Sequence, residues 1–405
     1  MSPALVSGYG ILCGAGCGAD AAWEGLVSGR SCCARVPEWL FLTELAYPVL
    51  TCPREPLGEV ADRFLPLSGL PEGASRTVAL AFAAASQGLA AAGLGPDDLS
   101  GLKIGIAMGT TVGCTFHDED YFVAWRAGQG PDLAPVRNFL GNNVAQALHR
   151  ILGTSGPAVV ITNACASSTD AVGLAADWVE SGVCDLALAG GADELSRVAL
   201  NGFASLMLTS DSPCRPYDVE RAGLNLGEGA AVLVFESEKR LAARSARPLA
   251  RLLGYGSAAD AWHPTAPHPE GRGLVAALKS AINRAGISAA PALINGHGTG
   301  TRANDQAETT ALAKVFDSAC PIPLVSTKGV TGHTLGAAGA VEALYTIEAL
   351  RRGMSPGTVG CIASDEEFPF APLIQGEEAH LASRIGISQS LAFGGTNSVL
   401  VIEAL

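Results

Sequence analysis

The sequence predicts a mixed α/β fold built on a central sheet. Short apolar segments of β type alternate with helical patterns along the chain, and this alternation is typical of sheets covered by helices. The composition supports a large buried core, because 48% of the 405 residues are hydrophobic and only 16% are charged. A chain of this length is expected to form two domains or a duplicated unit.

The first part of the chain contains one long apolar helix and four strands. The alanine-rich run 78–94 includes Ser86, Gln87 and two glycines, which favours a buried helix over a membrane span. A further helix follows Cys165 and is expected to end at Gly182, because glycine is common just past a helix end. The predicted strands are 103–108, 158–162, 185–189 and 231–235.

The second part repeats the alternation, although no sequence repeat is evident. The chain ends in what should be the last strand, so we expect no fused domain after it and a stand-alone protein. The predicted helices are 271–285, 306–316 and 340–351, and strands are expected near Ala292, near Ile385 and at 399–402.

Charge and cysteine content narrow the function classes. The chain has 26 Lys and Arg against 39 Asp and Glu, a net charge of −13, which does not favour nucleic acid or an anionic membrane. No lysine or arginine precedes Arg30, so a secretory signal is not expected. The eleven cysteines are irregularly spaced, which indicates reduced thiols in the cytoplasm, and no Cys-x-x-Cys pair supports a metal site.

Cys165 is the strongest candidate nucleophile. It lies where the apolar stretch 158–161 changes into a helical pattern, so its thiol is expected at a helix N-terminus. Unpaired N–H groups and the helix dipole favour the thiolate there, and the thiolate is the form that attacks a carbonyl carbon.

Two glycine-rich loops each carry a histidine after a short apolar segment. Asn-Gly-His-Gly-Thr-Gly-Thr spans 295–301 and holds His297, and Ser-Thr-Lys-Gly-Val-Thr-Gly-His spans 326–333 and holds His333. Glycine lets the backbone approach a ligand closely at a cost in rigidity, so two such loops indicate a binding or catalytic site.

Four motifs together resemble the β-ketoacyl-acyl carrier protein synthases. They are the run around Cys165, His-Gly-Thr-Gly-Thr at 297–301, Lys-Gly-Val-Thr-Gly-His at 328–333 with Gly-Ala-Ala-Gly at 336–339, and Phe-Gly-Gly-Thr-Asn at 393–397. The resemblance covers almost the whole chain and is strongest to the elongating Cys-His-His type of fatty-acid and type II polyketide synthesis. It implies a thiolase-like fold of two similar halves in five α-β-α-β-α layers, divided as residues 1–245 and 246–405.

The resemblance also implies roles for individual residues. Cys165 would carry the acyl group as a thioester, and His297 and His333 would stabilise the enolate formed when malonyl thioester loses carbon dioxide. Lys328 and Glu342 would orient the histidines. No bound cofactor is expected, because the substrates arrive on the phosphopantetheine arm of an acyl carrier protein.

The remaining implied residues surround these five. Backbone N–H groups of Cys165 and Phe393 would form an oxyanion hole, and Phe393 would gate the acyl site on a loop that Gly394 and Gly395 make mobile. The implied partners are an acyl carrier protein, acyl and malonyl thioesters, and a second ketosynthase-like subunit in a homodimer or heterodimer. The phosphopantetheine arm would contact Thr299 and Thr301, and the acyl pocket would include Val112 and Leu224.

Three departures from the family pattern point to a specialised pathway. Leu391-Ala392 replaces an aromatic residue and glycine before the gate, which predicts a stiffer gate. The run 221–229 lacks the usual aromatic or valine near the pocket, and 67–76 lacks most of the basic residues that dock acidic carriers. These features favour aryl polyene or polyketide synthesis over housekeeping fatty-acid synthesis.

Two alternatives remain open. A biosynthetic thiolase shares the fold but needs a second cysteine in the C-terminal glycine-rich loop, which here reads Phe-Gly-Gly-Thr-Asn. A non-catalytic chain-length-factor subunit characteristically lacks the nucleophile, whereas this chain carries Cys165 and both histidines.

Overall fold

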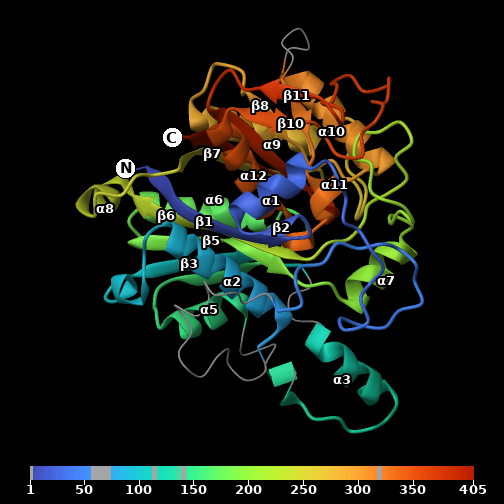
Figure 1. Ribbon diagram of the computed structural model, residues 1–405, viewed down its shortest axis with the longest axis horizontal. Helices are drawn as coiled ribbons and strands as arrows, with labels where there is room; N and C mark the ends of the chain where they lie inside the picture. The colour runs from blue at the N-terminus through green and yellow to red at the C-terminus, as the bar shows by residue number, and fades with distance from the viewer. Residues whose placement is uncertain (1–2, 56–73, 112–115, 135, 138–142, 317–321) are drawn as a thin grey trace.

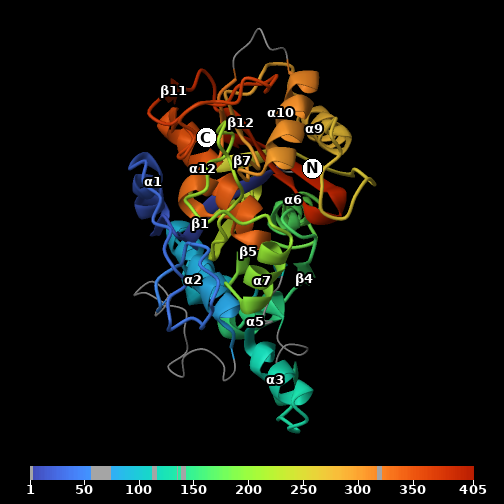
Figure 2. The same cartoon turned by 90° about the vertical axis from the view of Figure 1, so that its right-hand side faces the viewer.

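Five layers make up the molecule, as the fold-class prediction requires. The computed structural model describes residues 3–55, 74–111, 116–134, 136–137, 143–316 and 322–405. In this described part, eleven strands divide into two sheets of five main strands each, with the short β2 (Gly16–Cys17) paired to β1. The two sheets alternate with three layers of helices (Figures 1 and 2). The sheets join at one short contact between β1 and β7, where Leu5 pairs with Arg251 and Val6 with Ala250.

The strand order demonstrates the duplication. From the joint outward, the first sheet runs β1-β6-β5-β3-β4 and the second runs β7-β13-β12-β8-β9. In each sheet the first two neighbouring pairs are antiparallel and the last two are parallel. The strands of the first sheet are β1 (Ala4–Cys13), β3 (Ile104–Gly109), β4 (Ala158–Ile161), β5 (Leu186–Asp193) and β6 (Gly229–Ser237), and those of the second are β7 (Ala250–Ala259), β8 (Leu293–Asn295), β9 (Leu324–Val325), β12 (Ile385–Leu391) and β13 (Thr396–Ala404).

Two helices fill the middle layer and contact both sheets. They are α6 (Ser167–Glu180) and α12 (Ala338–Arg352), and they pack against each other. Every residue of α12 from Ala338 to Leu350 is buried, which explains its nearly continuous apolar and small-residue sequence. The outer layers hold α2 (Arg76–Ala91) and α5 (Val144–Leu152) on one side, and α9 (Arg272–Ala285) and α10 (Arg302–Val315) on the other.

Shorter elements connect these layers or lie at their edges. α8 falls in the connection from β6 to β7, where the sequence analysis places the division between residues 245 and 246. The shorter elements are β2 (Gly16–Cys17), α1 (Ala19–Val27), η2 (Pro96–Leu99), α3 (Phe116–Arg126), α7 (Arg197–Ser205), α8 (Glu238–Ala243), α11 (Lys328–Thr331), η4 (Leu335–Ala337), β10 (Met354–Pro356), β11 (Glu378–His380) and η5 (Phe393–Gly395).

A repeated Gly-Tyr-Gly segment marks the first strand of each half. It spans residues 8–10 in β1 and 254–256 in β7. A Cβ on Gly10 would lie 2.2 Å from a backbone oxygen of α2, and a Cβ on Gly254 would lie 2.2 Å from a backbone oxygen of α9. The glycines therefore let an outer helix pack directly on each strand. Neither the repeat nor these two strands is predicted from the sequence, because paired glycines weaken a strand pattern.

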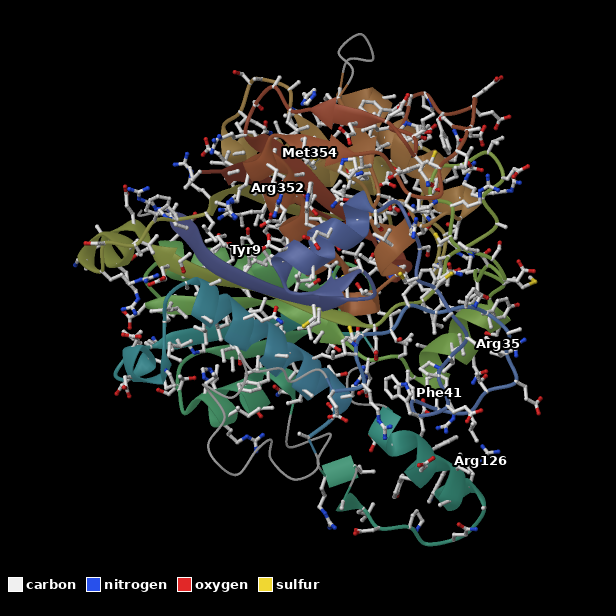
Figure 3. All side chains as sticks on the ribbon, viewed as in Figure 1. Tyr9, Arg35, Phe41, Arg126, Arg352 and Met354 are labelled. Atoms are coloured by element: carbon white, nitrogen blue, oxygen red, sulfur yellow. The ribbon has the colours of Figure 1, made fainter. Side chains whose placement is uncertain are left out.

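The tyrosine of each segment points into the middle layer. Tyr9 donates to Glu348 of α12 and accepts from Arg351 at 2.7 Å, and Figure 3 shows Tyr9 and Arg352 where β1 meets the end of that helix. Tyr255 donates to Asp170 of α6 at 2.9 Å. Each half thus fastens its first strand to a central helix.

The predicted elements agree with the observed ones to within a few residues. The helix after Cys165 begins at Ser167 and has Ser181 as its C-cap. Gly182 is the next residue, with φ 72°, and the N–H groups of Gly182 and Val183 donate to the carbonyls of Val179 and Trp178, so the predicted glycine terminates the helix. Across the described ranges, no helix is both long and apolar enough to cross a bilayer.

Candidate active site

Cys165 lies in the tight turn that joins β4 to α6. Ala164 has φ 46°, in the left-handed region that L-residues rarely adopt. Two backbone hydrogen bonds close the turn. The N–H of Ala166 donates to Asn163 O and the N–H of Ser167 donates to Ala164 O, both at 3.2 Å. The prediction that Cys165 sits at the N-terminal end of a helix is therefore confirmed.

The predicted thiolate is not the resting form. Burial raises the pKa of Cys165 to about 11, while the charge of Lys328 and the backbone N–H of Phe393 act in the opposite direction. Loss of hydration therefore outweighs the groups that stabilise a negative sulfur. The expectation of a lowered pKa is wrong for the free site, and the thiol proton must leave during the reaction.

His297 is held by a buried acid that the sequence analysis missed. The backbone N–H groups of His297 and Gly298 donate to the two oxygens of Glu308, at 2.5 and 2.8 Å. Tyr217 and Gln389 donate to the same carboxylate, at 2.8 and 2.7 Å. Glu308 lies within α10, eleven residues after the histidine, and no local pattern distinguishes it from a surface helix residue.

His333 follows α11 and is fixed through backbone groups. Its own N–H donates to Asn225 O at 2.8 Å, and its Nδ1 faces the N–H of Leu335 at 3.0 Å. Because the Leu335 N–H can only donate, Nδ1 is the acceptor and Nε2 carries the proton. His333 therefore presents an N–H donor at Nε2.

Lys328 gives His297 the same tautomer. Lys328 Nζ is 3.2 Å from His297 Nδ1, donates to His297 O at 2.6 Å and pairs with Glu342. An ammonium group can only donate, so Nδ1 accepts and Nε2–H remains free. Burial raises the pKa of Glu342 to about 7, against the opposing charge of Lys328. Of the two residues predicted to orient the histidines, Lys328 contacts His297 directly, and Glu342 contacts it through Lys328.

The three predicted catalytic side chains meet in one place. The sulfur of Cys165 and one ring nitrogen each of His297 and His333 all lie within 4.8 Å of one another. The centroids of the two imidazole rings are 5.2 Å apart, and the ring planes make an angle of 85°. Burial, followed by the charge of Lys328, holds the pKa of both histidines well below the usual value, so both rings are neutral. Although this set has the composition of a metal site, its two Nε2–H donors suit a developing oxyanion better than a cation.

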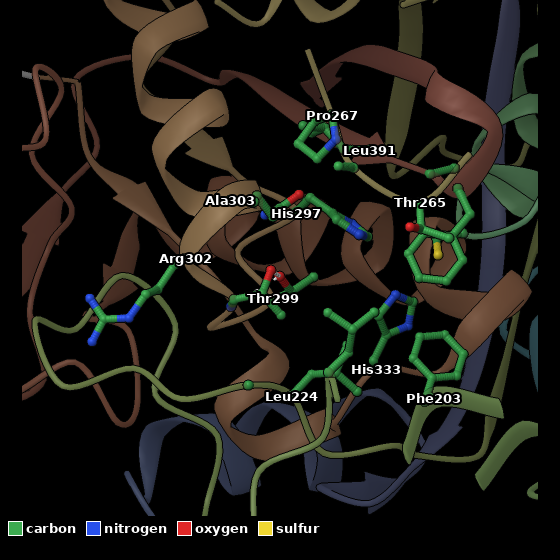
Figure 4. Close-up of a pocket in the computed structure, with 18 of the residues that line it drawn as sticks. Phe203, Leu224, Thr265, Pro267, His297, Thr299, Arg302, Ala303, His333 and Leu391 are labelled. Atoms are coloured by element: carbon green, nitrogen blue, oxygen red, sulfur yellow. Dashed lines mark hydrogen bonds between the residues drawn. The ribbon is translucent and has the colours of Figure 1, made fainter. Parts of the chain in front are cut away.

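A cavity of about 390 Å³ leads to these groups. Figure 4 shows the rings of His297 and His333 at one side of it and Arg302 at the other, with Thr299 between the histidines and Arg302. Thr299 and Thr301 line the cavity and share a hydrogen bond of 2.8 Å between their hydroxyl groups. Leu224 also lines it, whereas Val112 lies outside the described residues.

The predicted gating loop borders the same cavity. Gly394 and Gly395 have φ 83° and 80°, so they form the left-handed turn, while Ala392 has an extended φ of −123°. Alanine is therefore unstrained at 392. The ring of Phe393 stacks on Phe203 of α7, with centroids 5.4 Å apart, and Phe203 also lies 6.1 Å from His333. Phe203 is a second site residue that the sequence analysis missed.

The region expected to dock a carrier is only partly described. Residues 67–73 lie outside the described ranges, and Arg76 is the basic residue that remains. Arg76 donates to both oxygens of buried Glu228, at 2.9 and 2.6 Å, and lies over the ring of Trp39. It is therefore committed to internal contacts.

Comparisons with known proteins agree with this geometry. The family models "Beta-ketoacyl synthase, N-terminal domain" and "Beta-ketoacyl synthase, C-terminal domain" match residues 1–240 and 249–361. The chain is 32% identical to 3-oxoacyl-(acyl-carrier-protein) synthase 2 of Rhizobium meliloti (strain 1021), over 100% of this chain and 99% of that protein. It is 31% identical to Nodulation protein E of the same strain, over 98% of each.

Solved structures give the same result. A structure described as the ishigamide ketosynthase/chain length factor superposes with a TM-score of 0.91 at 31% identity, covering 100% of this chain and 99% of the other. The ketosynthase ApeO in complex with its chain length factor ApeC, from Xenorhabdus doucetiae, gives 0.81 at 30% identity, covering 100% and 98%. With its Cys-His-His site, this chain belongs to the β-ketoacyl synthase family of acyltransferases.

Proposed function

We propose that the chain joins an acyl group held on Cys165 to malonyl-acyl carrier protein, with loss of carbon dioxide, to give β-ketoacyl-acyl carrier protein. One observation carries the proposal: the Cys165 thiol and the two neutral histidines, each with a proton on Nε2, converge in the wall of a cavity of about 390 Å³ that more than twenty residues line. This arrangement supplies a nucleophile and an anion-binding pair within reach of one substrate carbon.

The first step would transfer the acyl group. Cys165 Sγ attacks the thioester carbonyl carbon, and the oxyanion accepts hydrogen bonds from the backbone N–H groups of Cys165 and Phe393. The bond from carbon to the pantetheine sulfur then breaks, and the thiol proton leaves with that sulfur. Both N–H groups are directed at Sγ in the resting site, which supports this oxyanion hole. One such donor typically contributes about 10²- to 10³-fold in rate.

The second step would use the histidines. The bond between C2 of the malonyl group and its carboxylate breaks and releases carbon dioxide, and the electron pair forms an enolate whose oxygen accepts from His297 and His333. C2 then attacks the acyl carbon, the carbon–sulfur bond to Cys165 breaks, and the sulfur takes up a proton. Neutral rings suit this role, because an Nε2–H donor strengthens its hydrogen bond as charge develops.

The surrounding residues would bind the arm and the acyl chain. The hydroxyl groups of Thr299 and Thr301 are placed to contact phosphopantetheine, and Leu224 and Val112 are proposed for the acyl pocket. Phe393, Gly394 and Gly395 would gate entry, since Phe393 borders the cavity, its ring stacks on Phe203, and both glycines adopt a positive φ. Lys328 and Glu342 would act as positioning residues.

The partner would be an acyl carrier protein, together with a second copy or a ketosynthase-like subunit. Two structural relatives are described with a chain length factor, which supports a heterodimer. The internal pairing of Arg76 supports a carrier that differs from the usual strongly acidic one and a specialised aryl polyene or polyketide pathway. The presence of Cys165 and both histidines favours the catalytic subunit over the chain-length-factor role.

Intact-mass analysis tests the nucleophile. Incubation with an acyl-pantetheine thioester should add one acyl group to the wild type and to Cys17→Ala, a matched change at an exposed cysteine, but none to Cys165→Ala. An adduct on Cys165→Ala contradicts the assignment.

Carbon dioxide release tests the division of labour. Cys165→Gln should decarboxylate malonyl thioester without condensing it, because the histidines rather than the sulfur hold the enolate. A folded Cys165→Gln protein that releases no carbon dioxide contradicts this division.

A further inference from the structure

Asp170 is a buried carboxylate held only by neutral donors in the described part of the chain. It lies in the first turn of α6, five residues after Cys165, and is 8% exposed. Its oxygens accept from Asn163 Nδ2 at 2.6 Å, from Tyr255 OH at 2.9 Å and from Ser398 Oγ. Three donors converging on a buried carboxylate fix the position of each donor strongly, because charge-assisted hydrogen bonds are short and directional.

The fold makes room for one of these donors. A Cβ on Gly173 would lie 2.4 Å from Cγ of Tyr255, so only glycine lets that ring rest on α6. Gly173 is three residues after Asp170 and therefore on the same face of the helix. Burial, followed by the Asp170 charge, raises the pKa of Tyr255, which keeps it a donor.

Asn163 joins this carboxylate to the gating loop. Since its amide nitrogen donates to Asp170, its Oδ1 is turned toward Thr396 and accepts from Oγ1 at 3.1 Å. Its backbone N–H donates to Ser167 Oγ at 2.8 Å, which fixes the turn that carries Cys165. One side chain thus connects the nucleophile turn to the first residue of β13.

Thr396 in turn closes the loop that carries Phe393. Thr396 O accepts from the N–H of Ala392 at 2.7 Å, so the segment 392–396 is joined at its base. The N–H of Phe393 is the next donor along the chain, and it faces Cys165 Sγ. The N–H of Gly394 also donates to Pro264 O, and the N–H of Asp260 donates to Gly395 O, both at 2.7 Å. Of these contacts, the Asn163–Thr396 hydrogen bond is the one that ties the loop to the turn that carries Cys165.

We propose that Asn163, oriented by Asp170, is a positioning residue for the oxyanion hole of the acyl-transfer step. This inference rests on the proposed function. The inference separates the two chemical steps. Loss of the Asn163–Thr396 hydrogen bond slows acyl transfer, because that step uses the Phe393 N–H. It leaves the rate of malonyl decarboxylation unchanged, because that step uses His297 and His333.

The test measures both steps on the same proteins. The probes are octanoyl-pantetheine, with single-turnover acylation followed by intact mass, and malonyl-pantetheine, with carbon dioxide release. Thr396→Val removes the hydroxyl group and keeps the shape, Thr396→Ser restores the hydroxyl group, and Asn163→Ala removes its partner. Thr310→Val is the matched control, because its hydroxyl group donates only within α10, to Gln306 O at 2.7 Å.

Acylation should slow roughly tenfold in Thr396→Val and Asn163→Ala, the size of one hydrogen bond. Decarboxylation should change less than about twofold, which also shows that these proteins are folded, and Thr396→Ser should acylate like the wild type. Equal losses in both steps, or no loss in either, overturn the inference. A wild-type protein that performs neither step contradicts the proposed function instead.

Discussion

Alkylation of Cys165 by iodoacetamide should accelerate steeply with pH and show no plateau in the neutral range. Only the thiolate reacts, so the rate follows its population. The position of Cys165 at a helix N-terminus, taken from the sequence, predicts a thiol that is already ionised near pH 7. The structure predicts the opposite, because burial raises the pKa of Cys165 to about 11.

The magnitude follows from this pKa. At pH 7 a thiol with a pKa of about 11 is ionised in about one molecule in 10⁴. An ordinary exposed cysteine is ionised in a few molecules per hundred at the same pH. The rate at Cys165 should therefore be roughly 10²-fold lower at pH 7 and should rise about tenfold per pH unit from 7 to 9.

Peptide mass spectrometry measures this rate without interference from the other thiols. The peptides that contain exposed Cys17 and Cys32 serve as internal references in the same digest. A rate at Cys165 that levels off below about pH 8 would refute the reasoning, because it would mean that the helix terminus and Lys328 outweigh burial.

Three further predictions concern other groups. Glu194→Gln should raise the melting temperature at pH 8.5 and leave it nearly unchanged at pH 5. Burial raises the pKa of Glu194 to about 8, so between about pH 4.5 and 8 the folded state holds a proton that the unfolded state has lost. The stability of the wild type therefore falls as the pH rises through this range, by at most about 5 kcal/mol. Equal pH slopes in thermal denaturation would contradict this. Lys328→Met should lower the free energy of unfolding by about 3 to 5 kcal/mol, and the double change Lys328→Met/Glu342→Leu should recover most of that stability but not condensation; a double variant as unstable as the single one in urea denaturation would argue against an uncompensated charge. Ala392→Gly should speed acylation by long acyl groups with little change in decarboxylation, and equal rates for short and long donors in both proteins would show that the gate does not limit the reaction.

The sequence is sufficient to predict the alternation of strands and helices and the three side chains that come together at the candidate site. Motifs such as those around Cys165, His297 and His333 are local, because a helix start or a tight turn needs particular residues at neighbouring positions. The same reasoning misses Glu308 and Phe203. Glu308 lies in a separate helix eleven residues after His297, and Phe203 is far in sequence from Phe393, on which it stacks. The helix of each residue would look the same in sequence if that residue faced solvent.

The sequence by itself determined the family of folds and three side chains, Cys165, His297 and His333, that converge in the structure. Tertiary structure alone decided their protonation states and their connections. Burial depends on how two sheets and a central helix pair close around the cysteine. The protonated thiol, the neutral histidines and the raised pKa of Glu342 therefore follow from packing rather than from neighbours in the chain. The link from Asp170 through Asn163 to Thr396 likewise exists only because the two halves of the fold meet at that turn.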